Sequence, residues 1–416
     1  MSGKIRLWLQ GSVHGNEPAG EQAILAFLGK LDANETWAKL VLEKVEIFVL
    51  PRYNPDGVAY FQRPLATGYD PNRDHTVLQR QQTRHIKELL ITFNPHVVLD
   101  VHEYTPTYFV SDSGVWVKAQ DALFSAAKSP NIHKDIIALS EGLFTDTVFA
   151  ALESNGMRTA PYFKVPEENV DEPVLDELNP ALEAGENSYG LLQSLSFLCE
   201  IRGIGLGDQH FRRRVASGLI VVETIIQLVV DNSDLVHSTV ESARRDFTDG
   251  IDEVIIEVKA RTTDITMEFI NSEDGSKVAV PSQFKNTTYP EKVLTRPRPE
   301  AYIFPGAWSD VAERLRVFGV EVEQTSEEYL GTVEALTIDT LSLANTRHQG
   351  IVGTSVTTSS RTREVRFPKG AYRVSTKQKN AAYAFVTLEP ENPTSYVRYN
   401  VILVARHEEY PVYRIL

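Results

Sequence analysis

The stretch "LWLQGSVHGNEPAGEQAIL", residues 7–25, decides the fold of the N-terminal half of this chain. An apolar run stops at Gly11, a polar loop with His14 and Glu17 follows, and apolar residues then return at helical spacing. A buried strand that leads through a short loop into a helix is the repeating unit of α/β layers. His14 and Glu17 are then either metal ligands at the end of a strand or ordinary polar residues of a loop.

The same alternation continues through the first 248 residues. Short apolar runs predict strands at 4–10, 44–50, 96–101 and 195–201, and helical spacing predicts helices at 19–30, 78–91 and within 211–247. We therefore expect an α/β domain over residues 1–248, with a mixed, mostly parallel sheet flanked by helices.

The predicted secondary structure changes from alternating strands and helices to mostly strands at about Asp249. Segments such as "DEVIIEVKAR" and "SYVRYNVILVA" are strand-like, and turn residues separate them. One helix is expected at 309–319, where Asp310 and Glu313 have the spacing of a capping box. Residues 249–416 are therefore predicted to form a second, β-rich α+β domain, whose role the sequence leaves open.

Composition excludes several classes of protein. The 416 residues include 42 basic and 56 acidic side chains, a net charge of −14, which disfavours binding to a phosphate backbone. No apolar run reaches the roughly 18 residues of a membrane span. The one cysteine, Cys199, allows no intrachain disulfide and is expected in the core because its strand is apolar.

Candidate metal ligands follow two of the predicted strands. His14 and Glu17 follow the first strand, and His102 ends the strand that begins near residue 96. Open α/β sheets place their sites at such strand ends. Two histidines and one carboxylate, with one position left for water, form the ligand set of a catalytic zinc. The pair His14 and Glu17 alone is weak evidence, since a loop histidine beside a capping glutamate gives the same pattern.

Three further motifs add to this pair. They are "PRYNPDG" (51–57), "YDPNRDH" (69–75) and "CEIRG" (199–203). In this order, and together with "DVHEY" (100–104), they resemble the M14 family of zinc carboxypeptidases over about residues 4–230, in spellings similar to a microbial branch. The resemblance implies a metallopeptidase that holds one Zn²⁺ per chain and hydrolyses the C-terminal peptide bond of a substrate with a free carboxylate.

The resemblance also implies a role for each matching residue. The metal ligands would be His14, Glu17 and His102; Asp70 would hold the far nitrogen of His14; Glu200 would be the general base; Arg63 would stabilise the oxyanion; and Asn72, Arg73 and Tyr104 would bind substrate. Each has a plainer alternative: a turn residue for Asp70, a helix cap for Asn72, an ion pair of Glu200 with Arg202, a solvated Arg63, and simple packing for Tyr104.

Two features of the family are harder to place. The mobile tyrosine that covers the substrate should lie in residues 156–190, where Tyr162 and Tyr189 are the candidates. The pocket for the terminal side chain is expected near Gly185, which favours neutral or apolar terminal residues. Three acidic residues, Asp176, Glu183 and Glu186, leave a basic preference open.

Other functions compete with the peptidase interpretation. A related zinc deacylase of N-acyl amino acids, or an amidase of cell-wall peptides, has similar ligands. From another class, a catalytically inactive binding protein on this scaffold is possible, but the intact triad with Glu200 argues against it. Because relatives of this branch look exported, we expect a secreted or periplasmic protein whose signal precedes residue 1; the cytoplasm and the oligomeric state stay open.

Overall fold

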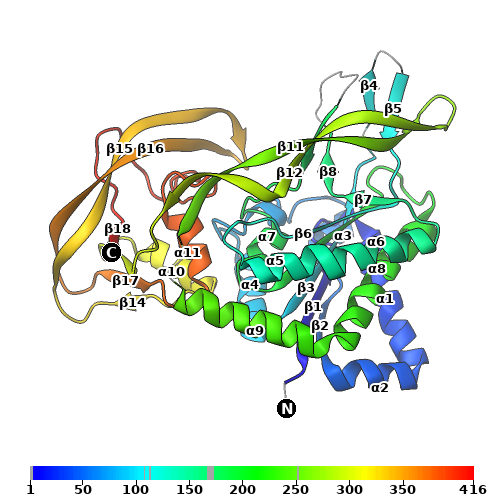
Figure 1. Ribbon diagram of the computed structural model, residues 1–416, viewed down its shortest axis with the longest axis horizontal. Coiled ribbons are helices and arrows are strands. Elements are labelled where there is room, and N and C mark those ends of the chain that lie inside the picture. The colour runs from blue at the N-terminus through cyan, green and yellow to red at the C-terminus, as the bar shows by residue number, and fades with distance from the viewer. Residues whose placement is uncertain (1–2, 107, 112–113, 166–172, 251–252) are drawn as a thin grey trace.

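The computed structural model describes residues 3–106, 108–111, 114–165, 173–250 and 253–416 (Figure 1). Its first half is built on a six-stranded sheet in the order β2-β1-β3-β10-β6-β7, parallel throughout except between β10 and β6. The strands are β1 Ile5–Gly11, β2 Val45–Leu50, β3 Val97–Tyr104, β6 Ala122–Ala126, β7 Thr159–Pro161 and β10 Leu195–Arg202. The predicted mixed, mostly parallel sheet is therefore confirmed.

Helices cover this sheet, as expected. They are α1 Pro18–Ala33, α2 Glu35–Lys44, α3 Pro55–Tyr60, α4 Gln81–Phe93, α5 Lys134–Leu139, α6 Thr145–Ser154, α7 Gly185–Gly190, α8 Phe211–Asp231 and α9 Ser233–Asp249, with a 3₁₀ turn at Pro71–Arg73 and a π turn at Ser140–Phe144. The predicted helical region 211–247 is two helices that bend by 84°. Among the described residues, no single helix is long and apolar enough to cross a membrane.

Strand alternation separates the two faces of the sheet at its functional end. Val101 and Ile201 meet α1 and α8, where Gly20 and Gly218 allow close approach. Successive side chains point to opposite faces of a strand. His102 therefore points to the other face, and its parallel partner in the register of β3 and β10 is Glu200. The sheet itself thus places a candidate ligand beside the candidate base.

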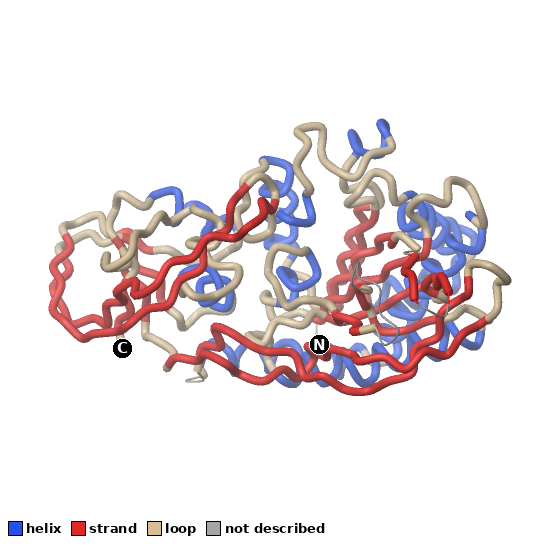
Figure 2. Tube along the Cα trace, turned by 90° about the horizontal axis from the view of Figure 1, so that it is seen from above, coloured by secondary structure: helices blue, strands red, loops and turns tan. Residues whose placement is uncertain are grey.

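A second sheet joins the two halves of the chain. Its order is β4-β5-β11-β12-β9-β8, with β4 Tyr108–Ser111, β5 Gly114–Lys118, β8 Phe163–Lys164, β9 Val174–Glu177, β11 Val254–Asn271 and β12 Lys277–Arg296. The long β11–β12 hairpin crosses much of the molecule and pairs with β5 and β9 (Figures 1 and 2). The division of the chain into domains 1–248 and 249–416 stays a prediction, and this sheet crosses it.

The remainder of the C-terminal part is β-rich, as expected. Its sheet has the order β14-β17-β13-β18-β15-β16, with β13 Ala301–Phe304, β14 Glu323–Gln324, β15 Tyr329–His348, β16 Ile351–Phe367, β17 Tyr372–Ser375 and β18 Tyr413–Ile415, beside helices α10 Ser309–Val317 and α11 Ala381–Leu388. The predicted capping box in α10 is wrong. The N-cap residue is Trp308 without a side-chain cap, and Asp310 instead accepts a hydrogen bond from Arg314 at 3.0 Å.

Candidate active site

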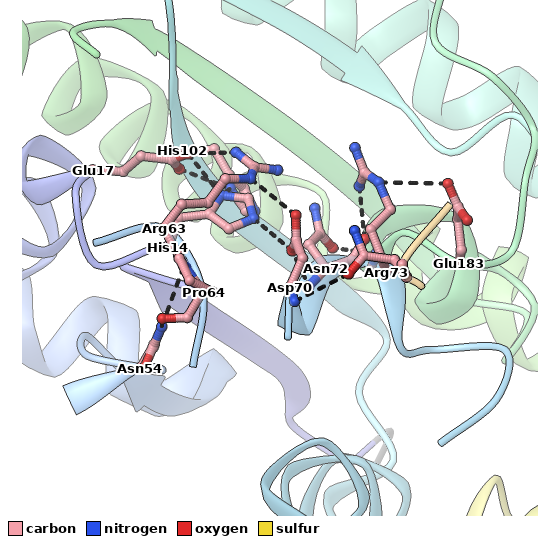
Figure 3. Close-up of polar contacts among 12 residues, drawn as sticks. His14, Glu17, Asn54, Arg63, Pro64, Asp70, Asn72, Arg73, His102 and Glu183 are labelled. Carbon is pink, nitrogen blue, oxygen red and sulfur yellow. Dashed lines mark hydrogen bonds and ion pairs between the residues drawn. The ribbon is translucent and has the colours of Figure 1, made fainter. Parts of the chain in front are cut away.

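Three predicted metal ligands converge at the carboxyl ends of β1 and β3. Their ligand atoms all lie within 4.8 Å of one another, and all three side chains are buried. His14 Nδ1 lies 2.6 Å from a Glu17 oxygen, and His102 Nδ1 lies 3.0 Å from the other oxygen and 3.2 Å from His14 Nδ1 (Figure 3). Two imidazole nitrogens and a carboxylate pointing at one spot fit a zinc ion.

Local sequence explains why the loop after β1 holds its ligands so tightly. A Cβ on Gly15 would lie 1.8 Å from the carbonyl carbon of Gly57, so only glycine allows this loop to pack on α3. Pro18 then starts α1, with Glu17 as the residue that precedes the helix. Burial alone would raise the pKa of Glu17, but the charge of His14 and hydrogen bonds with both histidines outweigh it and hold that pKa below its ordinary value.

Carboxylates also face the far nitrogens of both histidines. His14 Nε2 lies 3.1 Å from Asp70 Oδ1, as predicted, and His102 Nε2 lies 3.1 Å from Asp100 Oδ1. A hydrogen bond such as that between His14 and Asp70 fixes the ring orientation and tautomer of a metal-binding histidine, whereas the contact between His102 and Asp100 is an ion pair without hydrogen-bond geometry. Sequence reasoning missed Asp100, although its position two residues before His102 on one strand was a usable signal.

Asp70 also performs the turn role that the sequence left open. Its Oδ1 accepts a hydrogen bond from the backbone N–H of Asn72 at 2.8 Å and caps the 3₁₀ turn. Its Oδ2 accepts from Arg63 Nε at 2.9 Å. The two interpretations of Asp70 are therefore compatible.

Glu200 lies beside the ligand cluster, and one of its carboxylate oxygens is unpartnered among the described residues. Its Oε2 has no hydrogen-bond partner among the described residues, and Arg202 donates to the backbone of Lys118 instead. The alternative ion pair with Arg202 is therefore not formed. Burial raises the pKa of Glu200 to about 7, with the charge of Glu17 adding to this and that of His102 opposing it. A carboxylate with such a pKa can both take and give a proton near neutral pH.

The predicted cationic and amide groups line the same cleft. Arg63 Nη1 lies 3.3 Å from Glu17, so its guanidinium reaches the ligand cluster while its side chain stays 39% exposed. Asn72 does not cap the next helix, since α4 begins after Arg80; its Oδ1 accepts from Gly185 N–H at 2.7 Å. Arg73 donates through Nη1 to the carbonyl of Asn72 (Figure 3).

The cleft has a volume of about 390 Å³, and sequence reasoning did not assign some of its lining residues. Lys118 and Lys164 lie in it, and burial lowers the pKa of Lys118 to about 8. Glu186 also lines it, buried and with Oε2 unpartnered among the described residues. No sequence motif marks these two lysines, because they reach the cleft through the pairing of strands that are distant in the sequence.

Tyrosine positions differ from what sequence spacing suggested. Tyr162 lines the cleft, whereas Tyr189 is buried in the core and contacts Gln10, so Tyr189 is excluded as a substrate-covering residue. Tyr104 also lines the cleft, but its hydroxyl donates to the carbonyl of Gln120, which matches the packing alternative for that hydroxyl. Asp176 pairs with Lys285 instead of lining the cleft.

Proteins similar to this chain are known by sequence and by structure. The sequence model described as zinc carboxypeptidase matches residues 1–91. Carboxypeptidase 2 of Trichophyton rubrum is 46% identical over 414 residues, which is 100% of this chain and 77% of that protein. Probable carboxypeptidase 2 of Arthroderma benhamiae is 47% identical over 388 residues, 93% of this chain and 74% of that protein. A solved metallo-carboxypeptidase from Burkholderia cenocepacia aligns at 15% identity and a TM-score of 0.43, over 56% of this chain and 59% of that one.

An α/β sheet with a histidine–glutamate–histidine cluster at its strand ends has the features of a metal-dependent hydrolase. With relatives this similar over nearly its whole length, the chain belongs to the M14 family of zinc carboxypeptidases. It is a metallocarboxypeptidase.

Proposed function

We infer that this enzyme binds one zinc ion through His14, Glu17 and His102 and removes single residues from the C-terminus of peptides. The observation that carries this inference is the meeting of this ligand cluster, Glu200 and the Arg63–Asn72–Arg73 group in one cleft. A bound zinc ion supplies Lewis acidity, which acidifies water and polarises a carbonyl. The ligand atoms and their supporting carboxylates suit that ion.

Side chains of the protein then carry out proton transfer and stabilise the oxyanion. Glu200 takes the proton of the attacking water and returns it to the leaving amine, for which a pKa of about 7 is well matched. Arg63 lies against Glu17, where its charge stabilises the oxyanion that forms on the scissile carbonyl.

Asn72 and Arg73 supply the exopeptidase specificity. A guanidinium binds a carboxylate through two parallel hydrogen bonds, so Arg73 suits the free C-terminus of a peptide. Anchoring that end places only the last peptide bond near Glu200 and the ligand cluster. That the similar proteins are named carboxypeptidases supports this function over a deacylase.

Metal content gives the first test. The wild-type protein should hold about one zinc per chain by elemental mass spectrometry, and chelation should remove both the zinc and the hydrolysis of a C-terminal-acid peptide. His102→Ala should lose the zinc, whereas His85→Ala, a matched change on the exposed face of α4, should keep it. Full zinc binding by His102→Ala, or hydrolysis that survives complete metal removal, contradicts the assignment.

A further inference from the structure

The C-terminal part of the chain reaches the cleft through the tip of one long hairpin. Strands β15 and β16 are joined by the two-residue turn Gln349–Gly350, and both residues have positive φ, 51° and 79°. Two positive φ values give the tight turn that matches the twist of paired strands. This turn brings His348 to Glu183, which lines the cleft, and Gln349 Oε1 accepts a hydrogen bond from Asp70 N–H at 3.4 Å.

Glu183 is the residue at which the two parts meet. Its Oε2 accepts a hydrogen bond from the Tyr399 hydroxyl at 2.7 Å and lies 2.8 Å from His348 Nε2. Its Oε1 lies 3.5 Å from Arg73 Nε (Figure 3). Glu183 lines both the cleft and a neighbouring cavity of about 890 Å³ between the two parts of the chain. One carboxylate therefore links the C-terminal part to an arginine of the cleft.

These contacts restrict Glu183 and, through it, Arg73. The Glu183 side chain is 18% exposed, so its ion pair is largely shielded from water. Burial and the charge of Glu183 raise the pKa of Tyr399, so its hydroxyl stays protonated and donates. Arg73 is held at Nε by Glu183 and at Nη1 by the carbonyl of Asn72, and two contacts fix the plane of a guanidinium. A side chain that is already ordered loses less entropy when a ligand binds.

We propose that the C-terminal part of the chain is a positioning element for the substrate anchor: His348 and Tyr399 hold Glu183, and Glu183 orients Arg73 toward the terminal carboxylate. This inference rests on the proposed function of Arg73. His348, Tyr399 and Glu183 are positioning residues, since they act through Arg73. The three contacts also occupy Glu183, so it is not free to serve as the counter-ion of a basic terminal side chain.

The test separates substrate binding from turnover. The variants are His348→Ala, Tyr399→Phe and their combination, assayed on one peptide with a free C-terminal carboxylate. The combined variant should raise KM by about five- to tenfold, the effect of about one lost charged hydrogen bond, and keep kcat within about twofold. Zinc content should not change. Matched controls are His85→Ala and Tyr289→Phe, both at exposed positions, which should leave KM and kcat at the wild-type values.

A coupling measurement distinguishes positioning from general support of the fold. Glu183→Gln should raise KM by a similar factor, and adding the other two substitutions to it should change KM little, because all act through one contact. Multiplicative effects on KM, an unchanged KM in the combined variant, or a fall in kcat alone overturns the proposal. Tyr399→Phe removes only a hydroxyl and keeps the test decisive if the combined variant is unstable. If the wild-type protein itself fails to trim the peptide, the proposed function fails, and the positioning role fails with it.

Discussion

The single residue Asp70 connects three groups of the site. Its two oxygens contact His14, Arg63 and the N–H of Asn72. The sequence suggested either a turn residue or a partner of His14, and in the structure one carboxylate makes both contacts. The local D-P-N pattern predicted the turn, whereas the contact with His14 depends on packing across 56 positions of chain.

Asp70→Asn should therefore weaken zinc binding without destroying the fold. The amide keeps an oxygen for the cap but loses the negative charge that supports His14, which should lower zinc affinity by about 10- to 100-fold. Competition with a chromogenic chelator measures that affinity. Asp56→Asn, at an exposed position, is the control and should bind zinc as the wild type does. Equal affinities for all three proteins would contradict the supporting role of Asp70.

The lowered pKa of His96 predicts how the stability of the fold depends on pH. Burial lowers its pKa to about 3; the charges of Arg244, Arg6 and His237 act in the same direction and that of Glu241 opposes it. The unfolded chain then binds a proton near pH 6.5 that the folded chain resists, so this residue makes stability fall as the pH drops from about 6.5 to about 3.

The variant His96→Asn isolates this effect. An asparagine oxygen can still accept the hydrogen bond that His96 Nδ1 takes from Arg6 N–H at 2.9 Å, but it does not titrate. Urea midpoints measured between pH 7 and pH 4 should fall less steeply for the variant than for the wild type. Parallel pH profiles would show that His96 does not contribute.

Helix α1 packs closely against strand β3, and substitution of two glycines of the helix tests this contact. A Cβ on Gly20 would lie 2.6 Å from the backbone oxygen of Val101, whereas a Cβ on Gly29 of the same helix meets no atom within 4 Å. Gly20→Ala should lower the free energy of unfolding by about 1–3 kcal/mol through overpacking. Gly29→Ala should raise it by about 0.5–1 kcal/mol through helix propensity. Chemical denaturation measures both, and destabilisation of equal size at both positions would contradict the close packing of Gly20 on Val101.

The elements that the sequence predicted well are those with a strong local pattern. The strand–loop–helix from Ile5 to Ala33 was foreseen because its apolar runs and its polar loop agree. The capping box at Asp310 failed because a spacing alone does not show which residue begins the helix. Tyr189 could not be assigned from spacing either, since the packing around α7 directs its side chain into the core.

Contacts between residues far apart in the sequence join the C-terminal part of the chain to the N-terminal part. Tyr383 OH donates to the carbonyl of Thr76 at 2.7 Å, and Lys379 Nζ donates to Asn94 at 2.7 Å. Together with the pairing of the β11–β12 hairpin with β5 and β9, these hydrogen bonds join the C-terminal part of the chain to its N-terminal half. No local pattern encodes such pairing, which explains why the role of residues 249–416 could not be predicted from the sequence.

A chain that ends at Gly250 should therefore not behave as an independent enzyme. Strand β5 would lose its neighbour β11 and strand β9 its neighbour β12, and unpaired edges promote aggregation. We expect this fragment to aggregate, or to unfold at a lower temperature than the full chain, with little hydrolysis. Size-exclusion chromatography and thermal unfolding measure this. A monomeric fragment with full activity would instead show that residues 1–248 are a self-sufficient domain.

Carboxypeptidase action is measured most directly by digestion of one peptide in two forms, C-terminal acid and C-terminal amide, followed by mass spectrometry. Zinc-loaded wild-type protein should shorten only the acid form, one residue at a time, because Asn72 and Arg73 anchor the carboxylate. Glu200→Gln should retain zinc and lose this activity by a factor of at least about 100. Equal cleavage of both forms would contradict the anchoring, and failure to cleave either form with zinc bound would contradict the carboxypeptidase mechanism.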